Sequence, residues 1–203
     1  MSVGRGYFDS VYAGEADPWG FRSRWYEHRK RALTLASLTR ERYARAFEPG
    51  CSIGVLTSGL AARCDALLAW EVVPEAAARA RSALTGAEHV EVGRAAVPEE
   101  WPGGGFDLVV LSELLYYFDD ADLATVLALT VRSLTPEGTV VAVHWRHPVR
   151  DHVRSGDDAH RAVDAVPGLD RTVLHVERDF QLGVYECPGV RGSRSVAERE
   201  GLV

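Results

Sequence analysis

The stretch Ala46-Phe47-Glu48-Pro49-Gly50-Cys51-Ser52-Ile53-Gly54-Val55-Leu56-Thr57 decides the fold of this chain. A short apolar run ends in an acid, passes through two glycines and continues as an amphipathic segment. This pattern predicts a strand, a tight loop and the start of a helix, and in an open α/β sheet such a loop lies where nucleotide-like ligands bind. Glycine suits the loop because a side chain would hold a ligand away from the backbone, and because the turn can require a positive φ.

The spacing of the glycines indicates which ligand the loop binds. Gly50, Gly54 and Gly59 do not fit the G-x-G-x-x-G pattern that presents a helix N-terminus to a pyrophosphate, which disfavours a nicotinamide oxidoreductase. Glu48 is poorly placed for a phosphate and better suits a cationic group, such as the amino group of S-adenosylmethionine. Glu71 ends the next apolar run, where an acid would bond both ribose hydroxyls. The alternative is a helix N-terminus without a ligand, with Glu71 as a surface acid.

The composition limits the classes of protein to which this chain can belong. A chain of 203 residues with 46% hydrophobic content fits one domain with a substantial core, and we expect residues 1–203 to form it. A formal net charge of −6 argues against a nucleic-acid-binding surface. Three cysteines without metal spacing predict a reducing compartment. We find neither a signal peptide nor an apolar run approaching about 18 residues, so we expect a cytoplasmic protein with no membrane partner.

The first 40 residues form an N-terminal extension with two interpretations. Aromatic residues are frequent in its first half, and the periodicity over Trp25 to Leu38 predicts a helix. This helix either packs on the sheet edge with the aromatics as staples, or forms a lid over a cofactor. In the second case Trp19 would pack against the cofactor, and Lys30 or Arg29 would meet its carboxylate.

From Tyr43 onward, strand and helix patterns alternate, which is typical of a parallel sheet with crossover helices. Two predicted strands end at Glu48 and at Glu71. Five more cover residues 89–92, 106–112, 139–145, 171–177 and 180–186. The predicted helices cover 55–63, 74–84, 119–134 and 158–166. The expected fold is α/β: a Rossmann-like, seven-stranded, mostly parallel sheet with helices on both faces and an antiparallel C-terminal strand pair.

With these segments in order, the chain resembles a class I S-adenosylmethionine-dependent methyltransferase over nearly its full length. Residues 48–54 look like the first motif of that superfamily, and residues 106–113 look like its fourth-strand motif. Ser52 stands where the superfamily usually has a second glycine. The segments Asp17-Pro18-Trp19, Tyr26-Glu27 with Lys30, and 112–117 are similar to the nodulation protein S group, whose members N-methylate an amino sugar in a chitin-oligosaccharide signal. Residues 144–152 depart from that group, so its substrate is not carried over.

The resemblance implies S-adenosylmethionine as cofactor, S-adenosylhomocysteine as product, and a set of binding residues. Gly50, Cys51 and Gly54 would line the methionine portion, and Glu71 would hold the ribose. The other implied cofactor-binding residues are Val72 beside the adenine, Ala95 or Arg94 near its edge, Ser112 near the sulfonium, and Trp19 and Lys30 at the amino-acid end.

Methyl transfer requires alignment of a nucleophile and, for an amine or hydroxyl acceptor, removal of a proton. Histidine suits this task, and residues 144–152 leave the carboxyl end of the fifth strand. We therefore expect His144, and after it His147, to act as the base, with Tyr116 orienting a small-molecule acceptor. The alternative is that His147 and His152 are loop residues beside Pro148 and that Tyr116 packs in the core.

Two further hypotheses stay open at this point. A metal centre would use residues of the histidine-rich run, but His-x-x-His at a strand exit does not place both rings on one face, so we expect no metal. Its candidate ligands are His144, His147, Asp151, His152 and His160. A cofactor-binding but non-catalytic protein with a methyltransferase fold, acting as a partner or regulator, is the alternative to an enzyme.

Overall fold

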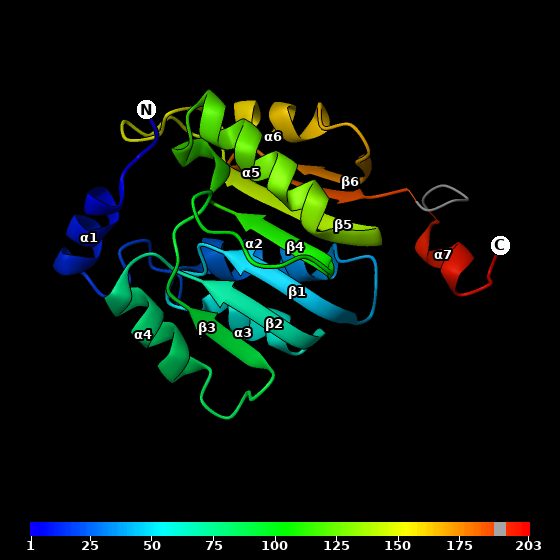
Figure 1. Ribbon diagram of the computed structural model, residues 1–203, viewed down its shortest axis with the longest axis horizontal. Helices are drawn as coiled ribbons and strands as arrows, with labels where there is room; N and C mark the ends of the chain where they lie inside the picture. The colour runs from blue at the N-terminus through cyan, green and yellow to red at the C-terminus, as the bar shows by residue number, and fades with distance from the viewer. Residues whose placement is uncertain (189–193) are drawn as a thin grey trace.

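The computed structural model describes residues 1–188 and 194–203, so the part of the predicted single domain from 189 to 193 lies outside the described residues. Within the described residues seven strands form one sheet (Figure 1). They are β1 (Tyr43–Pro49), β2 (Cys64–Trp70), β3 (Val90–Gly93), β4 (Phe106–Ser112), β5 (Leu134–Trp145), β6 (Asp170–Val176) and β7 (Phe180–Glu186). Their order across the sheet is β3-β2-β1-β4-β5-β7-β6. Strands β1 to β5 are parallel and β7 is antiparallel to both neighbours, which confirms the predicted fold class.

Helices cover both faces of this sheet. The helices of the described residues are α1 (Arg5–Gly14), α2 (Trp25–Ala36), α3 (Val55–Ala61), α4 (Pro74–Ala83), α5 (Asp120–Ser133), α6 (Gly156–Asp164), α7 (Val196–Arg199) and the short 3-10 helix η1 (Leu115–Tyr117). Of these, α1 and α7 lie at the ends of the strands rather than on a face (Figure 1). Helix α5 lies in front of the sheet in Figure 1, and α2 and α3 lie behind it. Within the described residues, no helix is long and apolar enough to span a membrane.

The central strands are apolar because each of their faces packs in a separate core. Phe106, Val109 and Leu111 of β4 belong to the core under α5 and α6, whereas Leu108 and Val110 belong to the core under α2 and α3. All five side chains are fully buried. A strand buried on both faces has no polar positions to alternate with apolar ones, which is why β4 was the clearest strand in the sequence.

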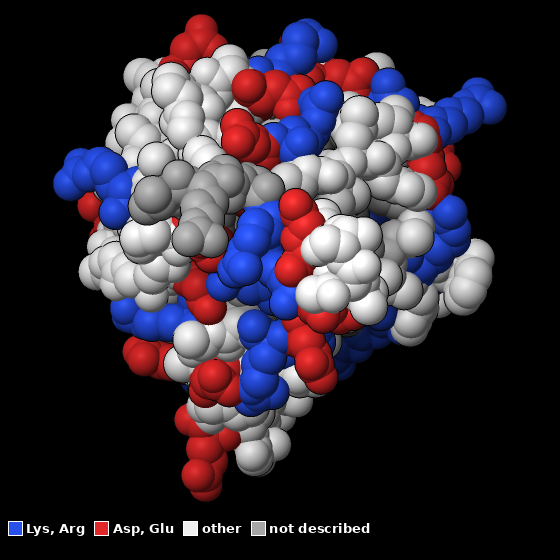
Figure 2. Space-filling model, turned by 90° about the vertical axis from the view of Figure 1, so that its right-hand side faces the viewer, with Lys and Arg blue, Asp and Glu red and all other residues white. Residues whose placement is uncertain are grey.

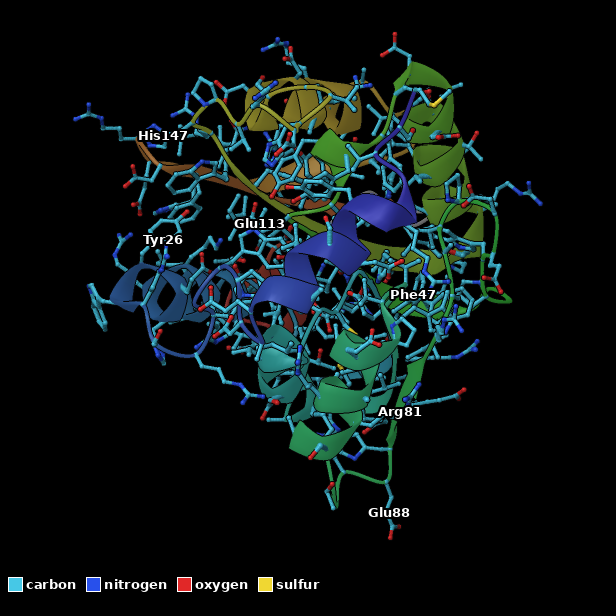
Figure 3. The ribbon with its side chains drawn as sticks, turned by 90° about the vertical axis from the view of Figure 1, so that its left-hand side faces the viewer. Tyr26, Phe47, Arg81, Glu88, Glu113 and His147 are labelled. Carbon is cyan, nitrogen blue, oxygen red and sulfur yellow. The ribbon has the colours of Figure 1, made fainter. Side chains whose placement is uncertain are left out.

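The parallel strands bring their carboxyl ends to one edge of the sheet, and helix α1 lies across that edge (Figures 1 and 3). The hydroxyl of Tyr12 in α1 is hydrogen-bonded to the hydroxyl of Ser52 in the loop after β1. Upstream of α1, the Val3 N–H donates to the carbonyl of Tyr117 at 2.9 Å. The N-terminal extension is therefore attached both to the loop after β1 and to η1 after β4.

The structure differs from the expected elements mainly at the two ends of the chain. Helices α1 and α7 were not predicted. Strand β5 begins at Leu134 rather than at Thr139, because Leu134 pairs with Phe106 of β4 in spite of the intervening Pro136 and Gly138. The breakers in this segment therefore end helix α5 without preventing the chain from joining the sheet.

Replacing Gly54 with alanine should destabilise the protein through both backbone strain and steric overlap. Gly54 precedes α3 with φ +78°, and an added Cβ would lie 3.0 Å from the Ala80 Cβ and 3.1 Å from its Cα. Gly86 has φ +90° with no atom within 4 Å of such a Cβ, so Gly86→Ala is the matched control that carries the strain alone. We expect a loss of about 1 kcal/mol for Gly86→Ala and about 2–4 kcal/mol for Gly54→Ala in urea denaturation. Equal losses would show that the contact with Ala80 relaxes without cost.

Candidate cofactor and acceptor site

A cavity of about 780 Å³ lies at the carboxyl edge of the sheet, bordered by the N-terminal extension. The structure brings eight of the ten predicted cofactor-binding residues to its wall: Trp19, Lys30, Gly50, Cys51, Glu71, Val72, Ala95 and Ser112. Trp19 also packs edge-on against Tyr12 of α1, with ring centroids 5.4 Å apart. These residues share one cavity, and their contact with a cofactor remains a prediction.

Gly54 and Arg94 are the two predicted cofactor-binding residues that do not line this cavity. Gly54 instead faces Ala80, where its missing side chain lets α3 and α4 approach each other. Arg94 is exposed, and of the two residues expected near the adenine edge it is Ala95 that reaches the cavity.

The loop after β1 is held in a conformation that favours glycine. Gly50 has φ +74° and Ser52 has φ +53°, in the left-handed region. The backbone N–H groups of Gly50 and Cys51 both donate to the carbonyl of Trp70 at the end of β2, at 2.7 and 2.9 Å. The loop is therefore tight although a serine occupies the position of the second glycine.

Glu71 is a buried carboxylate rather than a surface acid, with 5% of its surface exposed. Its Oε2 accepts from the Ser52 N–H and its Oε1 accepts from the Val73 N–H, both at 2.9 Å. Burial raises the pKa of this carboxyl, and the backbone hydrogen bonds oppose that rise. A carboxylate oxygen has a second lone pair, so Glu71 can also accept from a diol that enters the cavity.

Glu48 lines the same cavity from the end of β1 with 2% of its surface exposed. Its Oε2 has no hydrogen-bond partner among the described residues. Burial raises the pKa of Glu48 from 4.5 to about 8. Because a buried carboxylate without a partner is costly, this position fits a cationic group such as the ammonium of S-adenosylmethionine.

An ion-pair network connects helix α2 with the end of β4. The Nζ of Lys30 lies 2.5 Å from Glu113 Oε1 and 3.1 Å from Glu27 Oε1, and Lys30 is only 6% exposed. Glu113 Oε2 accepts from the Tyr116 hydroxyl at 2.6 Å and from the Trp145 N–H at 2.9 Å. Two of the three donors of Lys30 are therefore already used within the protein.

The sequence-based prediction did not include Glu113 as a site residue, although its signal was present. It follows directly after the buried strand β4 and adopts φ +52°, which directs it into the cavity wall instead of continuing the strand. Figure 3 shows Glu113 near the middle of this face of the molecule. Arg29, the alternative to Lys30, lies outside the cavity and bonds Glu177 at 2.6 Å.

The structure does not bring His144 or His147 to the cavity, contrary to the expectation for a strand exit. Side chains alternate along β5, so Val143 and Trp145 line the cavity while His144 points to the opposite face, toward His160 of α6. His144 is fully buried, its Nε2 accepts from the Leu115 N–H at 3.1 Å, and burial lowers its pKa well below 6.5. His147 lies at the periphery, 2.7 Å from Asp179 (Figure 3).

Tyr116, the third predicted catalytic residue, does line the cavity, together with a histidine that was not among the predicted catalytic residues. His152 stacks face to face on Tyr116 with ring centroids 3.8 Å apart and an interplanar angle of 13°. Residues 1–188 and 194–203 contain no group of three or more His, Cys, Asp or Glu side chains that could hold a metal ion.

Comparisons with known proteins show the family to which this chain is related. The family model for nodulation protein S matches residues 13–160. Nodulation protein S of Sinorhizobium fredii is 30% identical over 169 residues, which cover 82% of this chain and 77% of that protein. Nodulation protein S of Rhizobium tropici is 34% identical over 127 residues, which cover 62% of this chain and 53% of that protein.

Solved structures share the fold. N-methyltransferase NodS from Bradyrhizobium japonicum, in complex with S-adenosylhomocysteine, superposes with a TM-score of 0.80 at 23% identity, over 90% of this chain and 97% of that one. A methyltransferase-like protein from Pseudomonas syringae superposes with a TM-score of 0.72 at 42% identity, over 80% of this chain and 99% of that one.

The raised pKa of Glu48 predicts a stability difference between the wild type and Glu48→Gln that depends on pH. Between pH 4.5 and about 8 the unfolded chain has lost a proton that the folded chain retains, so the free energy of unfolding falls as the pH rises. The slope is at most about 1.4 kcal/mol per pH unit. The glutamine variant lacks this titration, so urea denaturation at a series of pH values should show the wild type losing stability relative to it. Parallel curves would contradict a buried, protonated Glu48.

Proposed function

Because this chain belongs to the nodulation protein S family and is an S-adenosylmethionine-dependent methyltransferase, we propose that it methylates a nitrogen atom of a small-molecule amine. The observation that carries this proposal is the composition of the cavity wall, where seven acidic side chains lie with four basic side chains and the N-terminal amino group. One of the seven, Glu48, is protonated in the free protein and would become charged when a cationic group binds beside it. An excess of acidic groups around a cavity concentrates cationic ligands. Both the sulfonium cofactor and a protonated amine are cations, whereas an alcohol gains nothing from this field.

We assign the cofactor to the part of the cavity at the ends of β1 and β2, bordered by Ser112 at the end of β4 and by Trp19 and Lys30 of the extension. Glu48 would face the amino group of the methionine portion, and Glu71 would accept from the ribose hydroxyls. Ala95 and Val72 would border the adenine. When bound, S-adenosylmethionine supplies an electrophilic methyl group on a cationic sulfur. The protein holds the acceptor, excludes water and removes a proton.

We also propose that residues 1–40 act as a lid. The support is that this extension contributes Trp19 and Lys30 to the cavity wall and is attached at Ser52 and at Tyr117. The volume of the cavity, about 780 Å³, lies within the range of about 300–1,000 Å³ for small-molecule sites.

Surface charge supports a small acceptor rather than a nucleic acid. The net charge is −6, and on the face shown in Figure 2 acidic and basic side chains are interspersed. A duplex or single strand would instead require a continuous basic surface. All three cysteines are free, which supports the proposal of a reducing, cytoplasmic location.

The proposal is tested by measuring methyl transfer from labelled S-adenosylmethionine to matched acceptor pairs. Glucosamine is compared with glucose, and a simple aromatic amine with the corresponding alcohol, since each pair differs only at the accepting atom. We expect label on amines and none on alcohols. Label on the alcohols alone would overturn nitrogen as the acceptor atom, and no label on any amine of the panel would overturn the proposal of a small-molecule amine as the acceptor.

Replacing Glu71 with glutamine should weaken cofactor binding. A hydrogen bond to a charged group contributes about 1.5–3 kcal/mol, so the Kd for S-adenosylhomocysteine in calorimetry should rise about 10- to 100-fold. Glu75→Gln is the matched control because Glu75 is exposed in the first turn of α4. Identical Kd values for the two variants would remove Glu71 from the cofactor site, provided that thermal denaturation shows both to be folded.

A further inference from the structure

Of the seven histidines in the chain, His152 alone lines the cavity. It lies in the loop between β5 and α6, which is held against η1. The backbone N–H of His152 donates to the Val149 carbonyl at 3.2 Å. The backbone N–H of the next residue, Val153, donates to the Tyr116 carbonyl at 2.9 Å. The ring itself is stacked on Tyr116 and meets the edge of Tyr117 at a centroid distance of 5.0 Å.

The ring nitrogens of His152 are free within the described part of the chain. Neither of them has a hydrogen-bond partner there, whereas His144 bonds the Leu115 N–H and His147 bonds Asp179. Burial lowers the pKa of His152 below 6.5. At neutral pH the ring is therefore uncharged, and one ring nitrogen has a lone pair that can accept a proton.

The position of His152 places it on the acceptor side of the cavity. Glu48 and Glu71 follow β1 and β2, whereas Tyr116 follows β4 and Trp145 ends β5. Tyr116, which supports the His152 ring, is itself fixed by its hydrogen bond to Glu113. The stacked pair is thus held rigidly beside the strand ends that border the proposed cofactor region, as a proton-accepting group must be.

We propose that His152 is the catalytic base of this methyltransferase, an inference that rests on the proposed function. The acceptor, bound in its ammonium form, would give a proton to the lone pair of a His152 ring nitrogen, and the electron pair of the broken N–H bond would stay on the acceptor nitrogen. The neutral amine would use that pair to form the bond to the methyl carbon of S-adenosylmethionine, while the bond from this carbon to sulfur breaks and its electron pair leaves on the sulfur of S-adenosylhomocysteine. The imidazolium then releases the proton to solvent.

The groups around His152 determine the pH range in which it acts. Glu113 from the end of β4 and Asp151 from the same loop favour its protonated form, while burial disfavours it more strongly. Tyr116 and Tyr117 pack on the ring. His144 of β5 contacts Tyr116 edge-on at a centroid distance of 5.4 Å and points toward His160 rather than toward His152. Since burial is the largest effect, kcat should fall as the pH drops below 6.5 and the ring becomes protonated.

The test uses His152→Ala and His152→Phe in the intact chain, with the amine that the wild type methylates fastest in the acceptor panel. Phenylalanine preserves stacking on Tyr116 but has no nitrogen, so it separates a base from a packing residue. We expect kcat to fall about 100-fold in both variants, with the Kd for S-adenosylhomocysteine unchanged. In both variants, the fall of kcat at low pH that the wild type shows should disappear. Added imidazole should restore part of the activity of His152→Ala.

His89→Gln is the histidine control, because His89 is exposed and bonds the Ala61 carbonyl far from the cavity. Wild-type turnover by His152→Phe, or a fall of kcat at low pH that both variants retain, would overturn the role of His152 and leave the proposed function standing. A wild-type protein that methylates no amine in the panel would overturn the proposed function itself, and the role of His152 with it.

Discussion

The hydrogen bonds that Glu71 accepts from the backbone of Ser52 and Val73 hold the site together. They join the loop after β1 to the end of β2, alongside the two bonds from Gly50 and Cys51 to the Trp70 carbonyl. A carboxylate buried in this way is stabilised by the N–H groups that it orients, so the same interaction shapes the loop and presents an acid to the cavity. The placement of Glu48 follows, because it lies just before the loop that these bonds fix.

The Lys30–Glu113 pair plays a corresponding part on the other side of the cavity. A buried ion pair contributes little net stability, but removing one partner leaves an uncompensated charge. Here the pair holds Glu113 in a left-handed conformation at the end of β4, from which its second oxygen binds Tyr116 and the Trp145 backbone. Helix α2, the end of β4 and the end of β5 are thereby set relative to one another by a single carboxylate.

Much of this fold could be predicted from local patterns, because β4 and the loop after β1 carry signals that do not depend on distant contacts. Helix α1 could not, since its glycine-rich sequence forms a helix only where Tyr12 and Phe8 find partners such as Ser52 and Tyr117. His144 was misplaced for a different reason. The run of apolar residues in β5, buried on both faces, conceals which face each position occupies, and a shift of one residue reverses the direction of the side chain.

Ser52 in the loop after β1 couples the conformation of that loop to the docking of helix α1. A non-glycine residue in the left-handed region costs about 1 kcal/mol or more, and the hydroxyl bond to Tyr12 offsets part of that cost only while α1 is docked. If the extension opens as the proposed lid, the loop would keep its strained Ser52 and lose the hydrogen bond from Tyr12. Opening of the lid and loosening of the cofactor loop would then be energetically coupled through Ser52.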